Sequence, residues 1–338
     1  MHPTAPPAAV GFLGLLAAGS LVMWVLVVLR LRAGEPLVPL EPRRPVPWGG
    51  VEILLIIAAY FFLGGLVSLL VLHIPVNASE PIFTPFNVLL MGAFSLVVVC
   101  IGAFVLRRLA GATWRDLGWS PHELTRDIRL GLAAGLVITA PVYAIQTLFT
   151  EWFEFPSEHP LLELVVREPT FLVYAVAIFL AVGVAPLAEE FLFRVLLQGW
   201  LEAWQSRSAA ERVLTREALI ELAASRADSN ASAIETPALP SDRDNPYAAP
   251  PATTRGAPID LSVELAASRL APAWWPLVAS AAIFAALHAT QGPDPIALFP
   301  LALVLGYLYR QTHRLLPSLV AHAFLNSASM LLLWLNLA

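Results

Sequence analysis

The run "FLVYAVAIFLAVGVAPLAEEFLF" occupies residues 171–193 and is apolar along nearly its whole length. A helix needs roughly 20 apolar residues to cross a hydrocarbon core of about 30 Å, so this run is long enough to span a membrane. Its end nevertheless carries two adjacent carboxylates, Glu189 and Glu190, and Arg194 follows at once. The run therefore predicts a membrane-spanning helix with a charged end that has to be accounted for.

The composition of the whole chain supports this interpretation. Of its 338 residues, 58% are hydrophobic and only 13% are charged, which is far more apolar than an ordinary soluble domain. We expect an all-α fold, a polytopic integral membrane helix bundle of about eight transmembrane helices. The predicted spans are residues 10–29, 51–72, 86–106, 130–149, 171–193, 274–289, 295–309 and 315–337.

Several simpler readings of the chain are excluded. The first apolar run has no basic residue before it and no small-residue cleavage pattern after it, so we interpret it as a retained helix rather than a signal peptide. Cys100 is the only cysteine, which excludes an intramolecular disulfide. The net charge is −5 and no basic run suggests a nucleic-acid partner. The lipid bilayer is the expected partner, and the sequence does not predict an oligomeric state.

The arginines predict the orientation, because the chain contains no lysine. With eight crossings, alternate loops lie on the same side of the membrane. Outside residues 205–270, the odd-numbered loops carry eleven arginines and the even-numbered loops carry only Arg167. Basic residues are enriched in cytoplasmic loops, so we expect the odd-numbered loops in the cytoplasm and both termini outside. The protein is expected to be a multi-pass protein of the inner or plasma membrane.

Composition also divides the chain into parts. Residues 205–270 are rich in Ala, Pro, Ser and Asp, so we expect a largely disordered cytoplasmic insert with helical ends at "ERVLTREALIELAASR" and "LSVELAASRL". The segment 111–128 is expected to lie at the membrane interface, with Ser120 capping a short helix that begins at Pro121. We predict accessory helices in residues 1–150 and a core made of residues 165–204 and 271–338.

The charged end of the quoted run needs partners if it lies within the membrane. Two Glu and one Arg left unpaired there would cost on the order of 8–10 kcal/mol. Glu190 and Arg194 are four residues apart, so they share one helix face and can form an ion pair. Glu189 is rotated by about 100° and stays available. The alternative is that the membrane boundary falls near Pro186 and the charges simply lie among headgroups.

Polar residues on two further apolar runs favour the buried alternative. His288 follows Phe284 by one turn in a predicted apolar helix, and His322 and Asn326 share one face of the last helix. Ionisable and amide side chains within spans usually face the bundle interior and mark function. Three separate helices therefore each offer one polar face.

These residues resemble the motifs of a known family. The segments "EEFLFR" (189–194), "FAALH" (284–288) and "HAFLN" (322–326) occur in the order found in the CPBP intramembrane proteases. That family includes the type II CAAX prenyl endopeptidases and the Abi bacteriocin-immunity proteins. The resemblance covers about residues 171–337, and the 205–270 insert between the first two motifs departs from the family pattern.

The resemblance implies a glutamate-dependent intramembrane endopeptidase without a cofactor. By matching position, Glu189 would be the general base that activates water, and His288 would assist it. His322 and Asn326 would stabilise the oxyanion, while Glu190 and Arg194 would hold the helix in place. The physical chemistry agrees, because a desolvated carboxylate is a better base and neutral or cationic donors suit charge that develops in the transition state.

Three alternatives use the same residues differently. A zinc peptidase could bind Zn²⁺ through Glu189, His288 and His322, although the chain has no "HExxH" motif. A proton-coupled transporter could relay protons through buried Glu and His, although the two halves of the chain show no repeat. A scaffold without catalytic activity would retain the fold for partner binding, although every motif position carries the expected residue.

The enzyme hypothesis requires Glu189 and His288 to lie close together. Glu189 lies about 27 Å along its helix from Phe171, whereas His288 lies about 21 Å into its own span, so straight helices would not bring them together. A kink at Gly183 or Pro186, strong tilt, or a recessed sixth span could close this gap. We expect Glu189, His288, His322 and Asn326 to converge in a water-accessible cavity on the cytoplasmic half, suited to a membrane-associated or lipidated peptide.

Overall fold

The described part of the chain is helical and contains no strand, which confirms the predicted all-α fold. The computed structural model describes residues 6–42, 45–72, 84–152, 160–232, 263, 266–267, 270, 273–289, 292 and 294–337. The N-terminal helices are α1 (Pro7–Arg32), α2 (Gly50–Leu72), α3 (Pro85–Leu109) and α4 (Leu124–Thr147). The later helices are α5 (Pro160–Arg167), α6 (Phe171–Ile178), α7 (Ala185–Glu190), α8 (Gly199–Ser232), α10 (Trp275–Ala286), α11 (Asp294–Thr312) and α12 (Leu315–Leu337).

Six helices within these residues are long and apolar enough to cross a membrane. They are Pro7–Arg32, Gly50–Val67, Pro85–Leu109, Pro121–Trp152, Phe171–Ala218 and Leu315–Leu337. The sixth predicted span, 274–289, is only the 12-residue α10. At about 1.5 Å per residue, α10 is too short to cross the hydrocarbon core alone. The predicted total of eight crossings therefore stays a prediction.

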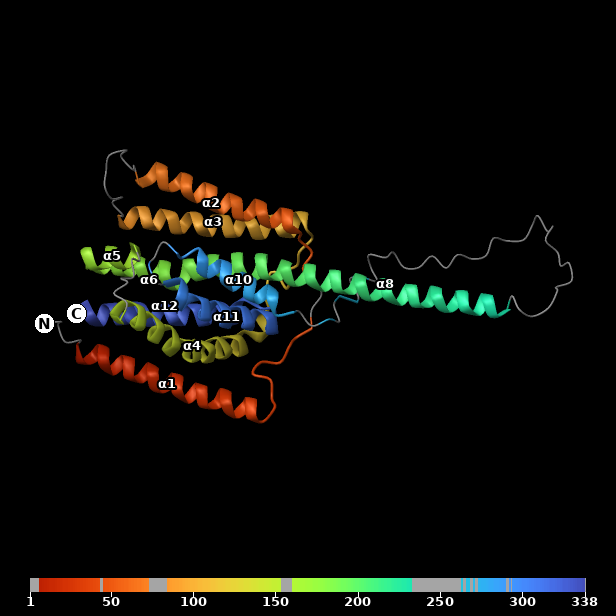
Figure 1. The fold of residues 1–338 in the computed structure, drawn as a ribbon. Coiled ribbons are helices and arrows are strands. Elements are labelled where there is room, and N and C mark those ends of the chain that lie inside the picture. The colour runs from red at the N-terminus through yellow and green to blue at the C-terminus, as the bar shows by residue number, and fades with distance from the viewer. Residues whose placement is uncertain are drawn as a thin grey trace. The chain divides into compact units, whose positions relative to one another are not determined.

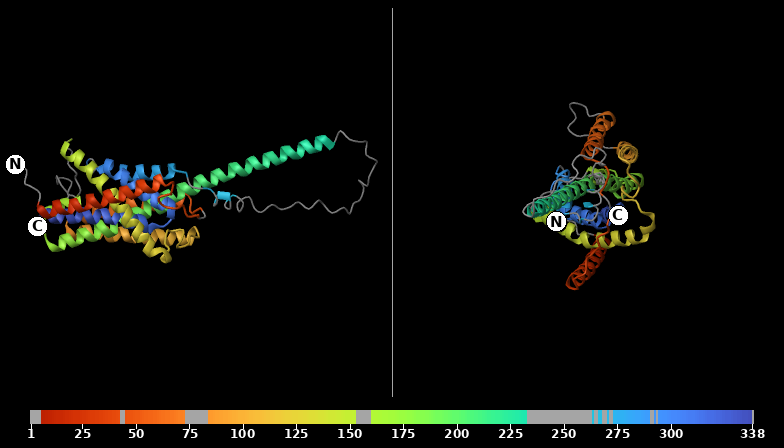
Figure 2. Two further views of the ribbon diagram at one scale, coloured as in Figure 1. Left: turned by 90° about the horizontal axis from the view of Figure 1, so that it is seen from below. Right: turned by 90° about the vertical axis from the view of Figure 1, so that its right-hand side faces the viewer.

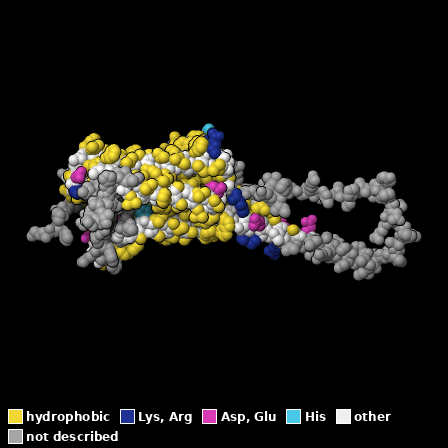
Figure 3. All heavy atoms as spheres, turned by 90° about the horizontal axis from the view of Figure 1, so that it is seen from above, with side chains coloured by type: hydrophobic (Ala, Val, Ile, Leu, Met, Phe, Trp, Pro, Cys, Tyr) yellow, Lys and Arg dark blue, Asp and Glu magenta, His cyan; other side chains and the backbone are white. Residues whose placement is uncertain are grey.

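The helices pass back and forth along a common direction. The start of α1 and the end of α12 lie at the same end of the bundle (Figure 1 and Figure 2). Basic residues occupy the last turns of α1, α3 and α11, all at the opposite end (Figure 1). The side of the bundle in Figure 3 is covered mainly by hydrophobic side chains. These features fit a multi-pass membrane protein.

Contacts divide the chain into two compact units. One contains residues 1–41, 46–201 and 273–338, and the other contains residues 42–45 and 202–272. In the second unit, Ala210, Val263 and Ala267 pack together. Because α8 continues to Ser232, the predicted helical start of the insert is confirmed. The predicted disorder at 233–262 lies outside the described residues, and the division into accessory helices and core stays a prediction.

The packing of α4 against α12 rests on two glycines one turn apart. A Cβ atom at Gly131 would lie 2.7 Å from the Pro317 carbonyl oxygen, and one at Gly135 would lie 2.8 Å from the Phe324 ring. Small residues spaced by four let helix backbones approach closely in a membrane, where packing rather than water drives association. This contact fixes α12 beside α4 along the turns on either side of His322.

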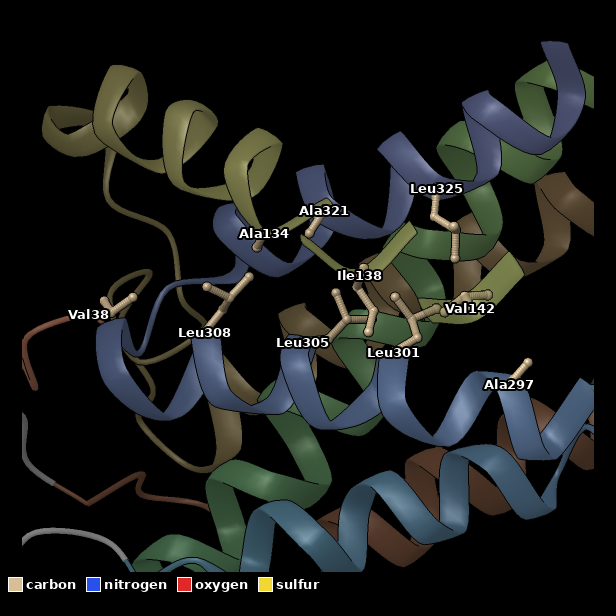
Figure 4. Packing of buried hydrophobic residues seen from close by; sticks show 10 residues of the cluster. All are labelled: Val38, Ala134, Ile138, Val142, Ala297, Leu301, Leu305, Leu308, Ala321 and Leu325. Atoms are coloured by element: carbon tan, nitrogen blue, oxygen red, sulfur yellow. The ribbon is translucent and has the colours of Figure 1, made fainter. Parts of the chain in front are cut away.

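A buried apolar cluster holds α4, α11 and α12 together (Figure 4). Ala321 and Leu325 of α12 face Ile138 of α4 and Leu305 of α11 in this cluster. These two residues flank His322 in sequence, so one face of α12 packs in the cluster while an adjacent face carries the imidazole. The complete cluster is Val38, Ala134, Ile138, Val142, Ala297, Leu301, Leu305, Leu308, Ala321 and Leu325.

Helix α1 is attached to α4 at a backbone position that a proline leaves without its usual donor. Pro141 lies inside α4 and has no N–H, so the carbonyl of Val137, four residues earlier, lacks its helical partner. Ser20 and Trp24 of α1 donate hydrogen bonds to this carbonyl at 3.4 and 3.0 Å. In lipid an unsatisfied carbonyl costs several kcal/mol, so these bonds stabilise α1 against α4.

The connector before α4 differs from its prediction in one respect. A short 3₁₀ helix begins at Pro121 with Ser120 at the N-cap position, as predicted, but the Ser120 side chain makes no capping hydrogen bond. The connector is instead ordered by Asp116, which accepts bonds from the backbone and hydroxyl of Thr113 at 2.8 and 2.7 Å. Gly118 adopts φ +81° and its carbonyl accepts a 2.9 Å bond from the backbone of Leu315. The connector is thereby tied to the start of α12.

A buried ion network secures the same region. Arg314 Nε lies 2.8 and 3.0 Å from the two carboxylate oxygens of Asp127, and Arg314 also pairs with Glu41. Burial lowers the pKa of Arg314, but its hydrogen bonds to the two carboxylates outweigh this and raise that pKa above its ordinary value. The guanidinium thus stays charged while it connects the α11–α12 turn to α4.

Replacing Gly131 by Ala tests the close contact of α4 with α12. The added Cβ would meet backbone and Cβ atoms of α12, and such overpacking costs about 1–3 kcal/mol. We expect the thermal unfolding midpoint in detergent to fall by several degrees. Gly14→Ala in α1 is the matched control, because its added Cβ meets no atom within 4 Å. Equal midpoints for the two variants would contradict the proposed packing.

Candidate active site

The two glutamates lie on a short α-helical turn between two wider π-helical segments. These segments are η3 (Phe179–Val184) and η4 (Phe191–Gln198), and α7 lies between them. The helix runs on from α6 to α8 without a break, and the π turns of η3 include Gly183 and end just before Pro186. Such π turns widen a helix locally and are frequent at functional sites.

Asn326 bonds to this helix at a point where a backbone donor is missing. The N–H of Ala185 donates to the carbonyl of Leu180, five residues earlier. In the same register the next donor would be the N–H of residue 186, but this residue is a proline. The Ala181 carbonyl therefore has no backbone donor in this register, and Asn326 Nδ2 donates a hydrogen bond to it at 2.7 Å. The amide therefore fixes α12 to the turn just before the glutamates.

Glu190 and Arg194 form a fully buried ion pair. Arg194 Nε lies 3.2 Å from Glu190 Oε2, and both side chains are 0% exposed. Arg194 Nη1 also donates to Ser280 Oγ of α10 at 3.3 Å, and Ser280 in turn donates to the Phe193 carbonyl at 2.8 Å. The pairing predicted from the four-residue spacing is confirmed, and α10 supports it from a second helix.

His322 connects α12 to both carboxylates. Its Nδ1 lies 3.1 Å from Glu190 Oε1, and its Nε2 lies 3.6 Å from Glu189 Oε2. An ionised carboxylate only accepts hydrogen bonds, so Nδ1 is the donor in the bond to Glu190. The two glutamates thus contact opposite nitrogens of one imidazole, which is itself buried.

Phe284 of α10 lies beside both histidines. Its ring centroid is 4.8 Å from that of His288 and 6.0 Å from that of His322. Its other neighbours include Phe193 at 5.2 Å and the Arg194 guanidinium at 5.4 Å. The phenyl ring is 1% exposed and packs close to both imidazoles and to the Arg194 guanidinium.

The prediction that His288 lies inside a helix is wrong. Helix α10 ends at Ala286, and His288 follows it in a turn, where its Nδ1 lies 2.8 Å from the Phe284 carbonyl. A carbonyl can only accept, so Nδ1 donates and Nε2 is left with its lone pair. His288 interacts electrostatically with Glu189, so the short α10 brings the two groups into one site.

The two glutamates differ in access. The side chain of Glu189 is 25% exposed, whereas that of Glu190 is 0% exposed. Glu189 also forms part of the wall of a cavity of about 260 Å³. Glu190 is committed to Arg194 and His322, so Glu189 is the carboxylate that a small molecule or peptide can reach.

Comparison with known proteins supports the same family. Residues 258–328 match the family model described as Type II CAAX prenyl endopeptidase Rce1-like. The resemblance to the CAAX endopeptidases is thereby confirmed for this segment. No curated protein and no solved structure matches the chain.

The matched segment contains part of the site. Phe284, His288, His322 and Asn326 lie within it, whereas the two glutamates and Arg194 lie before it. The contacts of His322 with both glutamates join the unmatched part of the site to the matched part. A match to the CAAX endopeptidase family indicates a membrane-embedded protease, which is a hydrolase.

Sequence reasoning missed three hydroxyl side chains near the site. Ser280 is 0% exposed and holds Arg194, while Tyr60 and Ser95 lie on α2 and α3 beside the cavity that Glu189 borders. The only available signal was Ser280, which lies one helical turn before Phe284 in "ASAAIF". Single hydroxyls are common in membrane helices because they can bond to the backbone, so they carry little pattern.

The metal alternative gains no support from the arrangement of donors. Among the described residues, no three His, Cys, Asp or Glu side chains are gathered so that they could hold a metal ion. Nδ1–H of His322 donates to Glu190 and Nδ1–H of His288 donates to a carbonyl. A histidine that binds a metal donates its other ring N–H in the same way, so each Nε2 is left as a potential ligand. The metal alternative therefore stays a hypothesis, which the comparison with and without a chelator tests.

Replacing Ser280 by Ala tests the support of the buried ion pair. The change removes a partner of Arg194 and leaves a buried donor unsatisfied, which costs about 1–3 kcal/mol. We expect a lower thermal midpoint in detergent. Ser327→Ala is the control, because Ser327 is exposed and bonds only within its own helix, to the Ala323 carbonyl. A Ser280→Ala variant as stable as the control would show that Arg194 does not need this hydroxyl.

Proposed function

We propose that the protein is an intramembrane endopeptidase that hydrolyses a peptide bond of a membrane-associated or lipidated peptide, with Glu189 as the base that activates water. The observation that carries the proposal is the contrast between the two glutamates. Glu190 is closed off in contacts with Arg194 and His322, while Glu189 is partly exposed beside a cavity and within 3.6 Å of an imidazole nitrogen.

Water activation suits the surroundings of Glu189. A general base must lie within reach of the water whose proton it takes, and its neighbours must tolerate the transfer. His288 and His322 both interact with the Glu189 carboxylate. The free Nε2 lone pair of His288 can accept a hydrogen bond from the same water, which orients its oxygen toward the scissile carbonyl.

His322 is suited to stabilise the oxyanion when it carries a proton on both nitrogens. Its Nδ1–H is held by the Glu190 carboxylate, which favours the imidazolium and leaves Nε2–H as a donor. Two carboxylates, one guanidinium and one imidazolium then sum to no net charge, which suits a buried cluster. A donor placed where negative charge develops is worth about 10²–10³ in kcat in other peptidases.

Asn326 has a double role in this proposal. One N–H of its amide positions the helix through Ala181, and its second N–H remains for the oxyanion. Glu190 and Arg194 act as positioning residues that hold His322. The site is expected to face the cytoplasmic half of the membrane, because the arginine-rich loops lie there by the charge rule.

The first test is cleavage of a quenched fluorescent peptide library by the purified protein in detergent. Wild type is compared with Glu189→Gln and His322→Ala, each with and without a strong chelator. We expect Glu189→Gln to lower kcat by at least 10²-fold with little change in KM, because it removes a group that acts in the transition state. Glu35→Gln is the matched control, since Glu35 is exposed in a loop and pairs only with Arg30.

The outcomes separate the alternatives. Activity that is lost in both variants and survives the chelator supports the glutamate mechanism. Loss of wild-type activity with the chelator, restored by added zinc, would favour the metal mechanism instead. Activity unaffected by Glu189→Gln would remove Glu189 from the proposed role, and a wild type that cleaves no peptide would contradict the proposed function.

A further inference from the structure

The cavity beside Glu189 is formed mostly by the two helices that precede the motif-bearing part of the chain. It has a volume of about 260 Å³ and lies between α2, α3 and the helix that carries the glutamates. Its wall is apolar apart from Tyr60, Ser95 and Glu189. A dry apolar cavity of about 150 Å³ can hold benzene, so this one has room for a larger group.

Glycines on the two helices create this space. At Gly65 of α2 an added Cβ would meet no atom within 4 Å, so the wall is open there. At Gly92 of α3 an added Cβ would lie 2.1 Å from Leu180 Cδ2, so α3 approaches the glutamate-bearing helix closely at that point. The cavity wall therefore combines a close contact of α3 with the glutamate-bearing helix at Gly92 and open space at Gly65 of α2.

Two hydroxyl groups, those of Tyr60 and Ser95, border the cavity together with Glu189. Ser95 Oγ donates to the Met91 carbonyl at 3.0 Å, so its proton is already used. The Tyr60 hydroxyl, 3.4 Å from Ser95 Oγ, is therefore the donor of that pair and keeps its own lone pairs as acceptors. Tyr60 also interacts electrostatically with Glu189. A hydroxyl that can accept an N–H thus lies next to the proposed base.

We infer that this cavity is a specificity subsite that takes one apolar side chain of the substrate, from a residue next to the scissile bond, while the Tyr60 hydroxyl accepts a hydrogen bond from the neighbouring substrate N–H. The occupant follows from the wall, because Glu189 belongs to it and any group that fills the cavity lies beside the base. Helices α2 and α3 then select the substrate rather than merely surround the site. This inference rests on the proposed peptidase function.

The test changes the size of the cavity in opposite directions. Gly65→Leu fills it and Met91→Ala enlarges it, and the peptide library then reports the preferred residues on each side of the cut. For Gly65→Leu we expect kcat/KM to fall about tenfold or more for peptides with a large apolar residue at one position, and to be retained for Ala at that position. Met91→Ala is expected to shift the same preference toward larger residues.

Two further variants complete the experiment. Gly11→Leu in α1 is the matched control, because Gly11 is outside the cavity and an added Cβ there meets no atom within 4 Å. Its size preference is expected to equal that of wild type. Tyr60→Phe is expected to keep the size preference and to lower kcat/KM about fivefold for all substrates, since it removes the hydroxyl that accepts the substrate N–H and leaves the ring in place.

The outcomes distinguish this inference from the function on which it rests. An active protein whose size preference is unchanged in both Gly65→Leu and Met91→Ala overturns the subsite and leaves the peptidase standing. A protein in which Gly65→Leu impairs only prenylated peptides, with no change in residue preference, has a lipid chain in the cavity, which also overturns the inference. A wild type without any peptidase activity removes the proposed function itself.

Discussion

The buried guanidinium of Arg194 is the charge on which the arrangement of the site depends. Its Nε donates to Glu190, its Nη1 donates to Ser280, and its central carbon atom, Cζ, lies 5.4 Å from the centre of the Phe284 ring. Without it, Glu190 would be an uncompensated carboxylate in a membrane-embedded core, which is among the most costly groups to bury. Because Glu190 is neutralised, it can hold His322, and His322 in turn lies against Glu189. Ser280 of α10 thus holds the Glu190–Arg194 ion pair, and the ion pair in turn holds His322 of α12.

The sequence predicted the parts of this arrangement that involve charge. Charged and imidazole side chains are rare in apolar helices and have few ways to be satisfied there, so their spacing limits their partners. Glu190 and Arg194, four residues apart, had to pair, and they do so at 3.2 Å. The motif order also identified His322, which contacts both glutamates. The helical fold itself followed from the length and composition of the apolar runs.

The sequence did not reveal the features that depend on backbone geometry or on single hydroxyls. The π turns on either side of α7 and the end of α10 at Ala286 leave no pattern, because the same apolar residues occur in any helix register. Residues 1–150 were predicted only as accessory helices, yet α2 and α3 supply Tyr60 and Ser95 to the cavity beside Glu189. A hydroxyl can be satisfied by its own helix, as Ser95 is by Met91, so only the folded chain shows which ones face a site.

The bond between Asn326 and the Ala181 carbonyl links two positions that are far apart in sequence. Pro186 has no N–H to donate to the Ala181 carbonyl, and the Asn326 amide donates one in its place. Each residue is therefore tolerable partly because of the other. A residue at position 186 that restored the N–H would make the bond from Asn326 dispensable, whereas loss of Asn326 alone would leave the carbonyl exposed within the membrane. The two sites are thus expected to show epistasis, so that the effect of a substitution at one depends on which residue occupies the other.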